Sequence, residues 1–409
     1  MTDVRAAIEA IWRIESPTVI AGVARLVGDV GLGEDFAQDA LVAALEQWPR
    51  DGMPVNPGAW LMTTAKRRAI DHVRRSETQQ RKYAEVATEL EEHDDMPDPE
   101  DVRDDLLRLV FIACHPVLSP PARAALTLRL LGSLTTDEIA RAFLVPEPTV
   151  AQRIVRAKRT LTEARAPFEL PGPVERASRL GSVLEVIYLI FNEGYAATAG
   201  EHWTRPELCE DALRLGRVLA ELMPRESEVH GLIALMELQA SRLRARVRPG
   251  GEPVLLLDQD RARWDRLLIG RGLRSLARAG ALGPLGSYGL QAAIAACHAR
   301  ARTAEETDWV LITAIYDVLA RVVPSPVVEL NRAVAVSMSL GPAAGLEIVD
   351  ALRDDPALKD YHLLPSVRGD LLTKLGRTEE ARQEFARAAA MTRNERERAL
   401  LEARAAALE

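Results

Sequence analysis

The sequence predicts an all-α protein with two to four domains. Its 409 residues exceed the size of one ordinary hydrophobic core. Apolar residues make up 47% of the chain and aromatic residues only 4%, whereas alanine, leucine and arginine are abundant. Apolar positions recur with helical spacing almost throughout. These observations favour helices packed on helices over a β-rich fold.

Residues 1–75 are expected to form the first helical domain. We expect its helices to be interrupted near Pro17, near Gly31–Gly33 and between Pro49 and Pro57. One predicted helix is acidic and another is basic. The first carries Glu34, Asp35, Gln38 and Asp39, and positions 35, 38 and 39 share one face; the second begins at Trp60 and carries Lys66, Arg67, Arg74 and Arg75.

Residues 76–103 are predicted to be an acidic, flexible linker. Glu85 to Asp105 holds eleven acidic residues and one arginine, together with Pro97 and Pro99. Such a segment cannot bury enough apolar surface to fold alone. It is interpreted either as a solvated tether or as a segment that binds a basic surface.

Residues 104–168 are predicted to form a second helical domain that contains a helix-turn-helix. Thr135 to Glu138 has the pattern of an N-terminal capping box. Pro146 ends that helix, and Pro148 lies where a proline opens the next one. In the second helix, a core-facing side is expected at Val150, Ile154, Ala157 and Leu161.

The other faces of this second helix are basic, and no acidic residue occurs from Pro148 to Thr162. A helix of this size fits the major groove of DNA, where cations meet phosphates and guanines. The net charge of the chain is −8, but residues 106–170 carry nine basic and five acidic residues. Local charge, not the total, sets the attraction to phosphates. The residues expected to face DNA are Thr149, Gln152, Arg153, Arg156, Lys158 and Arg159.

These two domains together resemble the ECF-type sigma factors of bacterial RNA polymerase. The resemblance rests on GEDFAQDAL (33–41), AWLMTTAKRRAIDHVRR (59–75) and IARAFLVPEPTVAQRIVRAKR (139–159). The family pattern has glycine at two positions of the last segment, where this chain has Leu144 and Pro148. The remainder is similar to sigma factors with a long tetratricopeptide-like C-terminal extension, through LIFNEGY (189–195), LLLDQDRARWDRLLI (255–269), QAAIAACHA (291–299) and SPVVELNRAVAV (325–336).

The resemblance implies two partners, core RNA polymerase and promoter DNA. The first domain, residues 1–75, corresponds to region 2 of the family. Its acidic helix would contact the basic clamp helices of the polymerase through Glu34, Asp35, Gln38 and Asp39. The second domain, residues 104–168, corresponds to region 4 of the family, which reads the distal promoter element. The implied base contacts are Thr149, Gln152 and Arg153; Lys158 and Arg159 would contact phosphates, and Arg156 could do either. Region 2 captures unpaired bases of the proximal element near Trp60, Lys66, Arg67, Arg74 and Arg75, although a core position is the more common setting for such a tryptophan.

Residues 174–409 are predicted to form a third, helical domain after the break at Leu170–Pro173. Leu340–Gly341 and Leu375–Gly376 each precede an apolar helix and are 35 residues apart. This spacing predicts tetratricopeptide-like helix pairs between residues 326 and 391, because that repeat has a period of about 34 residues. The extension is expected to contact the sigma domains or the acidic linker and to control or support their activity.

The chain shows no motif that predicts catalysis, a metal site or a cofactor. Cys114, Cys209 and Cys297 are widely spaced and are expected to be buried thiols in a reducing cytoplasm. Ala279 to Ala299 has no formal charge, yet its glycines predict a loop and a buried helix and not a membrane span. Asp258, Asp260 and Asp265 alternate with arginines; this pattern predicts a surface salt-bridge lattice on a helix or, alternatively, a docking surface.

The function predicted is therefore that of a sigma factor that recruits core polymerase to promoters and is controlled by its own C-terminal domain. Two alternatives stay open. One is a helix-turn-helix regulator with a C-terminal sensor domain, for which the acidic helix would have no use. The other is an enzyme that uses Asp258, Asp260 and Glu193 of the extension.

Overall fold

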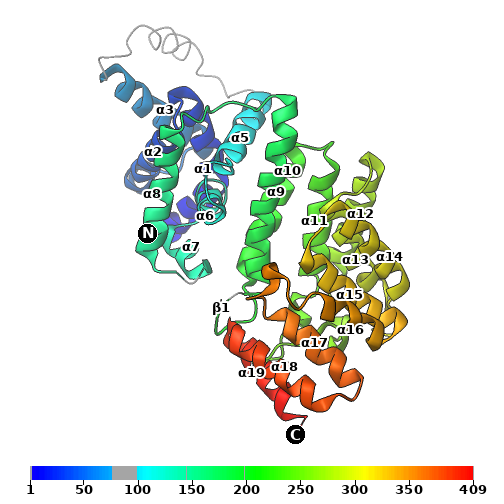
Figure 1. Ribbon diagram of the computed structural model, residues 1–409. Coiled ribbons are helices and arrows are strands. Elements are labelled where there is room, and N and C mark those ends of the chain that lie inside the picture. Colours follow the sequence, from blue (N-terminus) through cyan, green and yellow to red (C-terminus); the bar gives the residue numbers. More distant parts are fainter. Residues whose placement is uncertain (1, 76–98, 144, 198, 409) are drawn as a thin grey trace. The chain divides into compact units, whose positions relative to one another are not determined.

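The computed structural model describes residues 2–75, 99–143, 145–197 and 199–408, and confirms the all-α prediction (Figure 1). The chain divides into two compact units, Met1–Leu189 and Ile190–Glu409. The predicted linker falls largely outside the described residues, as does Leu144 at the turn of the helix-turn-helix. No helix among the described residues is long and apolar enough to cross a membrane.

The first unit begins with three mutually packed helices, whose shared core includes Ile8, Phe36 and Leu61. They are α1 (Thr2–Val27), α2 (Val30–Asp51) and α3 (Pro57–Arg75). The expected break near Pro17 is wrong, because α1 continues through this residue, with Val19 and Ile20 buried just beyond it. The break expected near Gly31–Gly33 is displaced, because these residues lie within α2; the chain turns just before them, at Gly28, which has a φ of +69°, and at Asp29, whose side chain caps α2.

The same unit continues with a second group of helices, α5 (Pro99–Ala113), α6 (Pro120–Leu130), α7 (Thr136–Phe143) and α8 (Glu147–Glu163). The helix α5 begins five residues before the predicted start of this domain. Its opening proline and the acids in its first turn, Glu100 and Asp101, favour a helix N-terminus there. It also packs on α1, where Asp105 Oδ2 accepts a 3.0 Å hydrogen bond from Arg25.

The long helix α9 (Pro173–Tyr195) starts at the predicted domain break, yet its residues up to Leu189 belong to the first unit. The Ser182 hydroxyl donates a 2.9 Å hydrogen bond to the Cys114 carbonyl. The buried Arg123 guanidinium lies 3.3 Å from Glu185. The break in the sequence at Leu170–Pro173 therefore precedes the boundary between the compact units.

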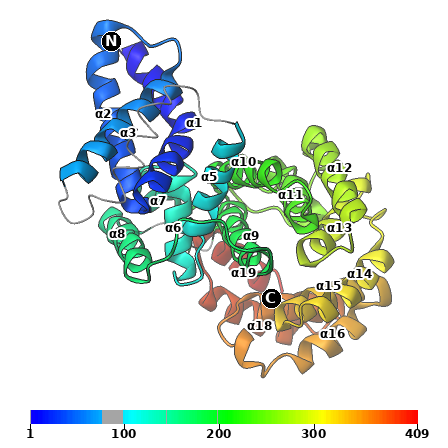
Figure 2. The same cartoon turned by 90° about the horizontal axis from the view of Figure 1, so that it is seen from above.

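The second unit is a series of helices in which chain neighbours lie side by side (Figures 1 and 2). Three 3₁₀ turns lie between α11 and α12. The uncharged stretch Ala279–Ala299 forms the end of α12, a turn and most of the largely buried helix α13, as predicted. The helices are α10 (Pro206–Leu222), α11 (Ser227–Ala240), α12 (Arg266–Leu282), α13 (Ser287–Arg300), α14 (Trp309–Val322), α15 (Pro326–Leu340), α16 (Pro342–Ala351), α17 (Leu363–Lys374), α18 (Thr378–Met391) and α19 (Glu395–Ala406).

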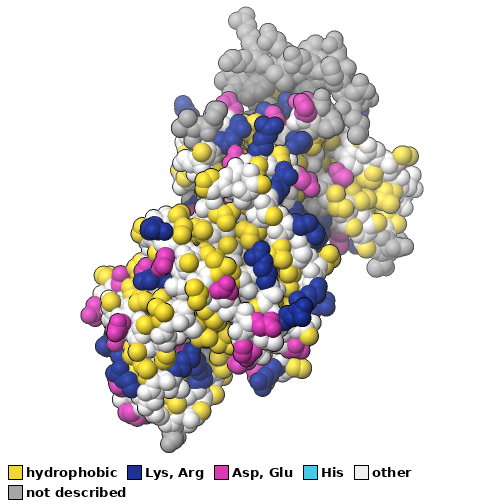
Figure 3. Space-filling view, turned by 90° about the vertical axis from the view of Figure 1, so that its right-hand side faces the viewer, with side chains coloured by type: hydrophobic (Ala, Val, Ile, Leu, Met, Phe, Trp, Pro, Cys, Tyr) yellow, Lys and Arg dark blue, Asp and Glu magenta, His cyan; other side chains and the backbone are white. Residues whose placement is uncertain are grey.

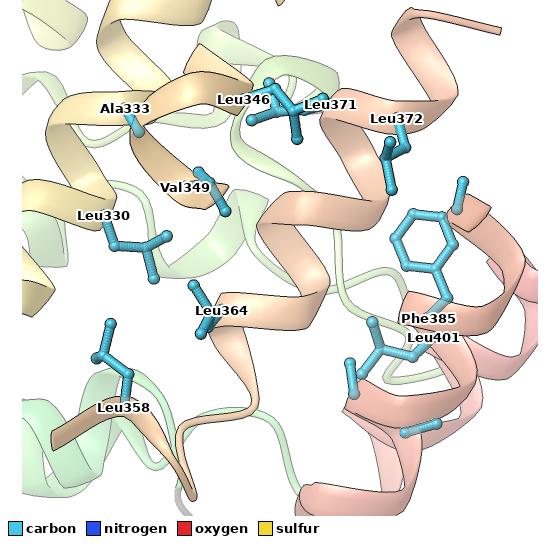
Figure 4. Packing of buried hydrophobic residues seen from close by; sticks show 13 residues of the cluster. Leu330, Ala333, Leu346, Val349, Leu358, Leu364, Leu371, Leu372, Phe385 and Leu401 are labelled. Carbon is cyan, nitrogen blue, oxygen red and sulfur yellow. The ribbon is translucent and has the colours of Figure 1, made fainter. Parts of the chain in front are cut away.

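The predicted repeats coincide with two helix pairs, α15–α16 and α17–α18, which are each joined at a glycine of positive φ, Gly341 and Gly376. Their facing sides share one apolar core with α19, in which Phe385 is 1% exposed (Figure 4). The end of the chain returns to the start of this unit through a short parallel pairing of β1 (Ala199–Gly200) with β2 (Arg393–Asn394). On the face shown in Figure 3, acidic and basic side chains are scattered among apolar ones.

Candidate nucleic-acid and polymerase interface

The predicted helix-turn-helix is formed by α7 and α8. The Thr135 amide donates a 2.8 Å hydrogen bond to Glu138 Oε2, and the Glu138 amide donates a 3.1 Å hydrogen bond to Thr135 Oγ1. This reciprocal pair is the capping box that the sequence predicts. The helix α8 begins beside Pro146, and its predicted core residues Val150, Ile154, Ala157 and Leu161 are all buried.

One exposed side of α8 brings together four of the residues predicted to face DNA. Thr149, Gln152, Arg153 and Arg156 line a cavity of about 360 Å³. No ion pair engages Arg153 or Arg156 in the part of the chain that the structure describes. This side therefore presents two uncompensated guanidinium groups beside neutral hydrogen-bonding side chains.

The opposite wall of this cavity is formed by the start of α6, which the sequence analysis did not single out. It includes Ser119, the exposed N-cap residue of α6, whose side chain makes no capping hydrogen bond. The Ser119–Pro120–Pro121 sequence is a helix-start signal that marks this position in retrospect. A free hydroxyl at a helix N-terminus suits a phosphate group.

Lys158 lies on a different side of α8 from this cavity. Its Nζ is 2.7 Å from Glu34 Oε2 and 3.5 Å from Asp35 Oδ1, and its side chain is 20% exposed. Arg159 is well exposed and pairs with Glu163 one turn later. Contact of Lys158 with DNA stays a prediction, and it requires the ammonium group to leave the two acids of α2.

Glu34 is buried where α2 meets α6 and α8. Its Oε1 accepts hydrogen bonds from Arg129 Nε at 2.6 Å and from Gln38 Nε2 at 2.5 Å. Burial alone raises the pKa of this carboxyl, but the nearby Lys158 and Arg129 outweigh burial and hold the pKa below its ordinary value. Glu34 is therefore a carboxylate that is neutralised within the first unit, and polymerase contact by Glu34 or Gln38 stays a prediction.

The other two acids of the predicted polymerase surface point outward. The side chains of Asp35 and Asp39 are 66% and 52% exposed, and Asp39 Oδ2 lies 3.3 Å from Arg68 of α3. Exposed ion pairs of this kind contribute little to stability. Asp35 and Asp39 are thus accessible to a partner in this arrangement, whereas Glu34 is not.

The predicted single-strand-binding residues of α3 differ in exposure. Trp60 is half-buried and packs edge-on against the buried Trp48, with ring centroids 5.3 Å apart. Burial and the nearby Arg25 lower the pKa of Lys66, which is also half-buried. Arg67 and Arg74 are exposed, and the side chain of Arg75 lies outside the described residues.

The carboxylates of the extension do not form the expected salt-bridge lattice, because the segment is not a continuous helix. It forms the 3₁₀ turns Leu256–Asp258 and Arg261–Arg263, and then α12 begins. Asp260 and Asp265 accept hydrogen bonds from the backbone amides that follow them, so Asp260 caps the turn Arg261–Arg263 and Asp265 caps α12. Glu193 pairs with Arg205. These carboxylates therefore have structural partners.

The three cysteines are buried free thiols, as expected. Burial raises the pKa of Cys114 to about 11 and that of Cys209 to about 12, so both are protonated at neutral pH. Cys114 lies 3.4 Å from the Thr127 hydroxyl. These thiols thus contribute to packing.

Comparison with known proteins finds three family models that match parts of the chain. Residues 11–79 match the model of sigma-70 region 2, and residues 108–161 match that of sigma-70 region 4. Residues 179–280 match DUF6596, a family of unknown function. The helical groups α1–α3 and α5–α8 are therefore regions of the sigma-70 class.

Similar proteins identify the subgroup of the sigma-70 class. The uncharacterized protein R00370 of Rhizobium meliloti is 44% identical over 393 residues, which are 94% of this chain and 92% of that protein. The ECF RNA polymerase sigma factor SigK of Mycobacterium ulcerans is 30% identical over 34% of this chain and 75% of its own length. The probable ECF RNA polymerase sigma factor SigI of Mycobacterium tuberculosis is 27% identical over 39% of this chain and 55% of its own length. The chain belongs to the ECF sigma factors and carries a C-terminal extension that contains a DUF6596 region.

Proposed function

We propose that this sigma factor recruits core RNA polymerase to a two-part promoter. The observation that carries the proposal is the exposed side of α8, where Thr149, Gln152, Arg153 and Arg156 line one cavity. Guanidinium and amide side chains at adjacent turns of a helix are the groups that read base edges in the major groove. Gln152 and Arg153 then contact bases, Thr149 lies at the start of the reading helix, and Arg156 contacts a base or a phosphate.

Region 2 supplies the second half of this function. Its exposed acids Asp35 and Asp39 suit a basic surface of core polymerase, because opposite charge steers and orients association. The exposed Arg67 and Arg74 of α3 suit the backbone of the melted strand, with Trp60 and Lys66 beside them. A sigma factor with these partners acts in the cytoplasm by binding and not by catalysis.

The contacts between α2 and α8 support a compact resting form of the free protein. Lys158 and Glu34 are each expected to meet a different partner, DNA and polymerase, yet they pair with each other. Thr162 Oγ1 also donates a 2.9 Å hydrogen bond to Asp29 of region 2. We propose that binding of polymerase separates these contacts and frees both residues.

The extension is proposed to support or regulate this transition. The first part of α9 contacts region 4 through Ser182 and Glu185, and this same helix leads into the extension. A rearrangement of region 4 would therefore strain or release α9. Contact of the extension with the acidic linker stays a proposal.

Copurification and runoff transcription test the proposed function. The purified protein should bind core polymerase and direct it to a start site on a template that carries its own upstream region. Failure to bind core polymerase while still binding duplex DNA would favour the alternative of a helix-turn-helix regulator with a C-terminal sensor.

A further inference from the structure

The second unit contains an arginine-rich cavity that the proposed sigma functions do not use. Its volume is about 670 Å³. It lies between residues 244–249 and residues 262–265, which come just before α12. Cavities of several hundred Å³ are the usual size for small-molecule sites. Its wall includes Arg244, Arg248 and Arg263, together with Trp264.

The three wall arginines are not engaged in ion pairs with the acids that the structure describes. All three are exposed, and none forms an ion pair among the described residues. Arginines elsewhere in the same unit are commonly paired; Arg368, for example, lies 2.7 Å from Asp350 and 2.9 Å from Glu384. The guanidinium groups of this cavity are therefore available for an anion.

A second layer of arginines adds positive potential behind Trp264. The guanidinium groups of Arg242 and Arg261 lie 5.6 and 5.1 Å from its ring. Both are nearly buried and bind neutral acceptors; Arg242 donates to the Tyr195 hydroxyl, and Arg261 donates to two carbonyls and a threonine. Arg246 lies 3.8 Å from the centroid of the Tyr195 ring.

A buried histidine, His298, lies beside these arginines, and its carbonyl accepts a hydrogen bond from Arg261. Burial, followed by the positive charges of Arg242 and Arg261, lowers the pKa of His298 to about 3. The acids nearby reduce the excess charge without removing it. Asp265 is in the cavity wall, but its carboxylate is occupied by the amides of Leu267 and Leu268. Residues 242–266 carry seven arginines and four acids.

Buried polar groups without hydrogen-bond partners also favour a ligand at this cavity. Trp264 is 3% exposed and lines the cavity, and its Nε1–H has no hydrogen-bond partner in the described structure. Nε of Arg246 and Nε of Arg261 are likewise unpartnered. Buried indole and guanidinium N–H groups normally have acceptors. Of these three donors only the Trp264 indole belongs to the cavity wall, and it is a buried donor that a ligand with acceptor atoms could satisfy.

We propose that this cavity binds a small organic anion with phosphate or carboxylate groups. The planar guanidinium fork matches both groups with two parallel hydrogen bonds. Val247 and Pro249 give the wall an apolar part that suits the body of such a molecule. The DUF6596 region would then act as a metabolite-sensing part of the sigma factor.

Calorimetric titration of the full-length protein tests this proposal. The probes are pyrophosphate and AMP for phosphates, and citrate for carboxylates. At least one should bind saturably, and its Kd should rise at least tenfold in the double variant Arg244→Gln, Arg263→Gln. The preference between pyrophosphate or AMP and citrate identifies which anionic group the site takes.

A matched double variant controls for net charge. Arg225→Gln with Arg321→Gln also removes two exposed arginines of this unit, but neither lines the cavity, so the Kd should stay unchanged. If circular dichroism shows that the first variant does not fold, the single variant Arg248→Gln replaces it with an expected threefold or larger rise in Kd.

Two results would overturn the proposal. The first is the absence of saturable binding by all three probes, or equal binding by the wild type and the cavity variant. The second is a loss of binding to duplex DNA in the cavity variant without any change toward the small anions, because the arginines would then serve nucleic acid.

Discussion

Lys158 Nζ lies 2.7 Å from Glu34 Oε2, so a cation of α8, the second helix of the helix-turn-helix, pairs with a buried acid of region 2. Arg129 meets the other oxygen of the same carboxylate at 2.6 Å. Glu34 thus joins three helices, α2, α6 and α8, at one point. This contact joins region 2 to region 4. It pairs Lys158, which is expected to bind DNA, with Glu34, which is expected to bind core polymerase.

Replacing Glu34 with glutamine should destabilise the free protein. The change removes the buried carboxylate that Lys158 and Arg129 share and leaves only the exposed Asp35 beside Lys158. Breaking a buried ion pair costs about 3 kcal/mol or more. Urea unfolding should show this loss. In a double-mutant cycle with Lys158→Met, a coupling energy of about 1 kcal/mol or more is expected. Asp39→Asn serves as the control, because its pair with Arg68 is exposed and should cost only about 0–1 kcal/mol.

The same carboxylate should make stability depend on pH in the acid range. Lys158 and Arg129 hold the pKa of Glu34 below its ordinary value of 4.5 despite burial. A lowered pKa in the folded state gives stability that is complete above the unfolded pKa and is lost as the pH falls through the folded pKa. The free energy of unfolding should therefore differ most between wild type and Glu34→Gln above pH 4.5, and the difference should shrink below it. A difference that stays constant on acidification would contradict this assignment.

The reading helix should show two kinds of DNA contact. Arg153→Ala should weaken binding of the preferred promoter by about 1–3 kcal/mol and relax preference at one base position, as expected for a base contact. Arg159→Ala should weaken all sequences to a similar extent and flatten the salt dependence, as expected for a phosphate contact. Fluorescence anisotropy on a set of single-base variants distinguishes them. Equal, sequence-independent losses for both variants would show that Arg153 does not read a base.

Lys158→Ala is a composite change in this structure. It removes a predicted phosphate contact, and it also releases Glu34 and weakens the contact between α2 and α8. Weaker DNA binding together with lower free-state stability is expected. For this reason Arg159, whose pair with Glu163 is exposed, is the cleaner probe of phosphate binding.

Charge reversal at the exposed acids of α2 should impair binding of core polymerase. Asp35→Lys with Asp39→Lys would place cations against a basic partner, and like-charge contact at an interface costs several kcal/mol. Pull-down of core enzyme measures the effect. Glu46→Lys with Asp51→Lys is the matched control, because both acids are exposed on the same helix outside the predicted surface. Similar losses in the two variants would indicate a general charge effect.

The helix-turn-helix was predictable because its signals are local. The capping box joins Thr135 and Glu138, which are three positions apart, and the buried positions of α8 follow one helical stripe. The burial of Glu34 was not predictable in this way. Its partner Arg129 is 95 residues away, and only packing of the two regions brings them together.

Local context also explains two of the expectations that were wrong. Pro17 lies inside α1, where packing around Val19 and Ile20 maintains the helix despite the lost hydrogen bond. Asp260 and Asp265 were spaced like a helical salt-bridge ladder, but short acidic side chains also bond to the amides that follow them. Asp260 caps a 3₁₀ turn and Asp265 caps α12, and the arginines between them are left for other contacts.

Truncation should separate the structural role of α9 from the proposed regulatory role of the extension. A chain that ends at Pro171 loses all of α9, including Ser182 and Glu185, which contact region 4. A chain that ends at Tyr195 keeps these contacts and loses only the helices from α10 onward. The shorter chain should therefore unfold at a lower urea concentration than the longer one.

If the extension regulates the sigma regions, the chain ending at Tyr195 should stay folded and bind core polymerase but differ from the full-length protein in runoff transcription. Equal transcription by that chain and the full-length protein would show that the extension has no regulatory effect under those conditions.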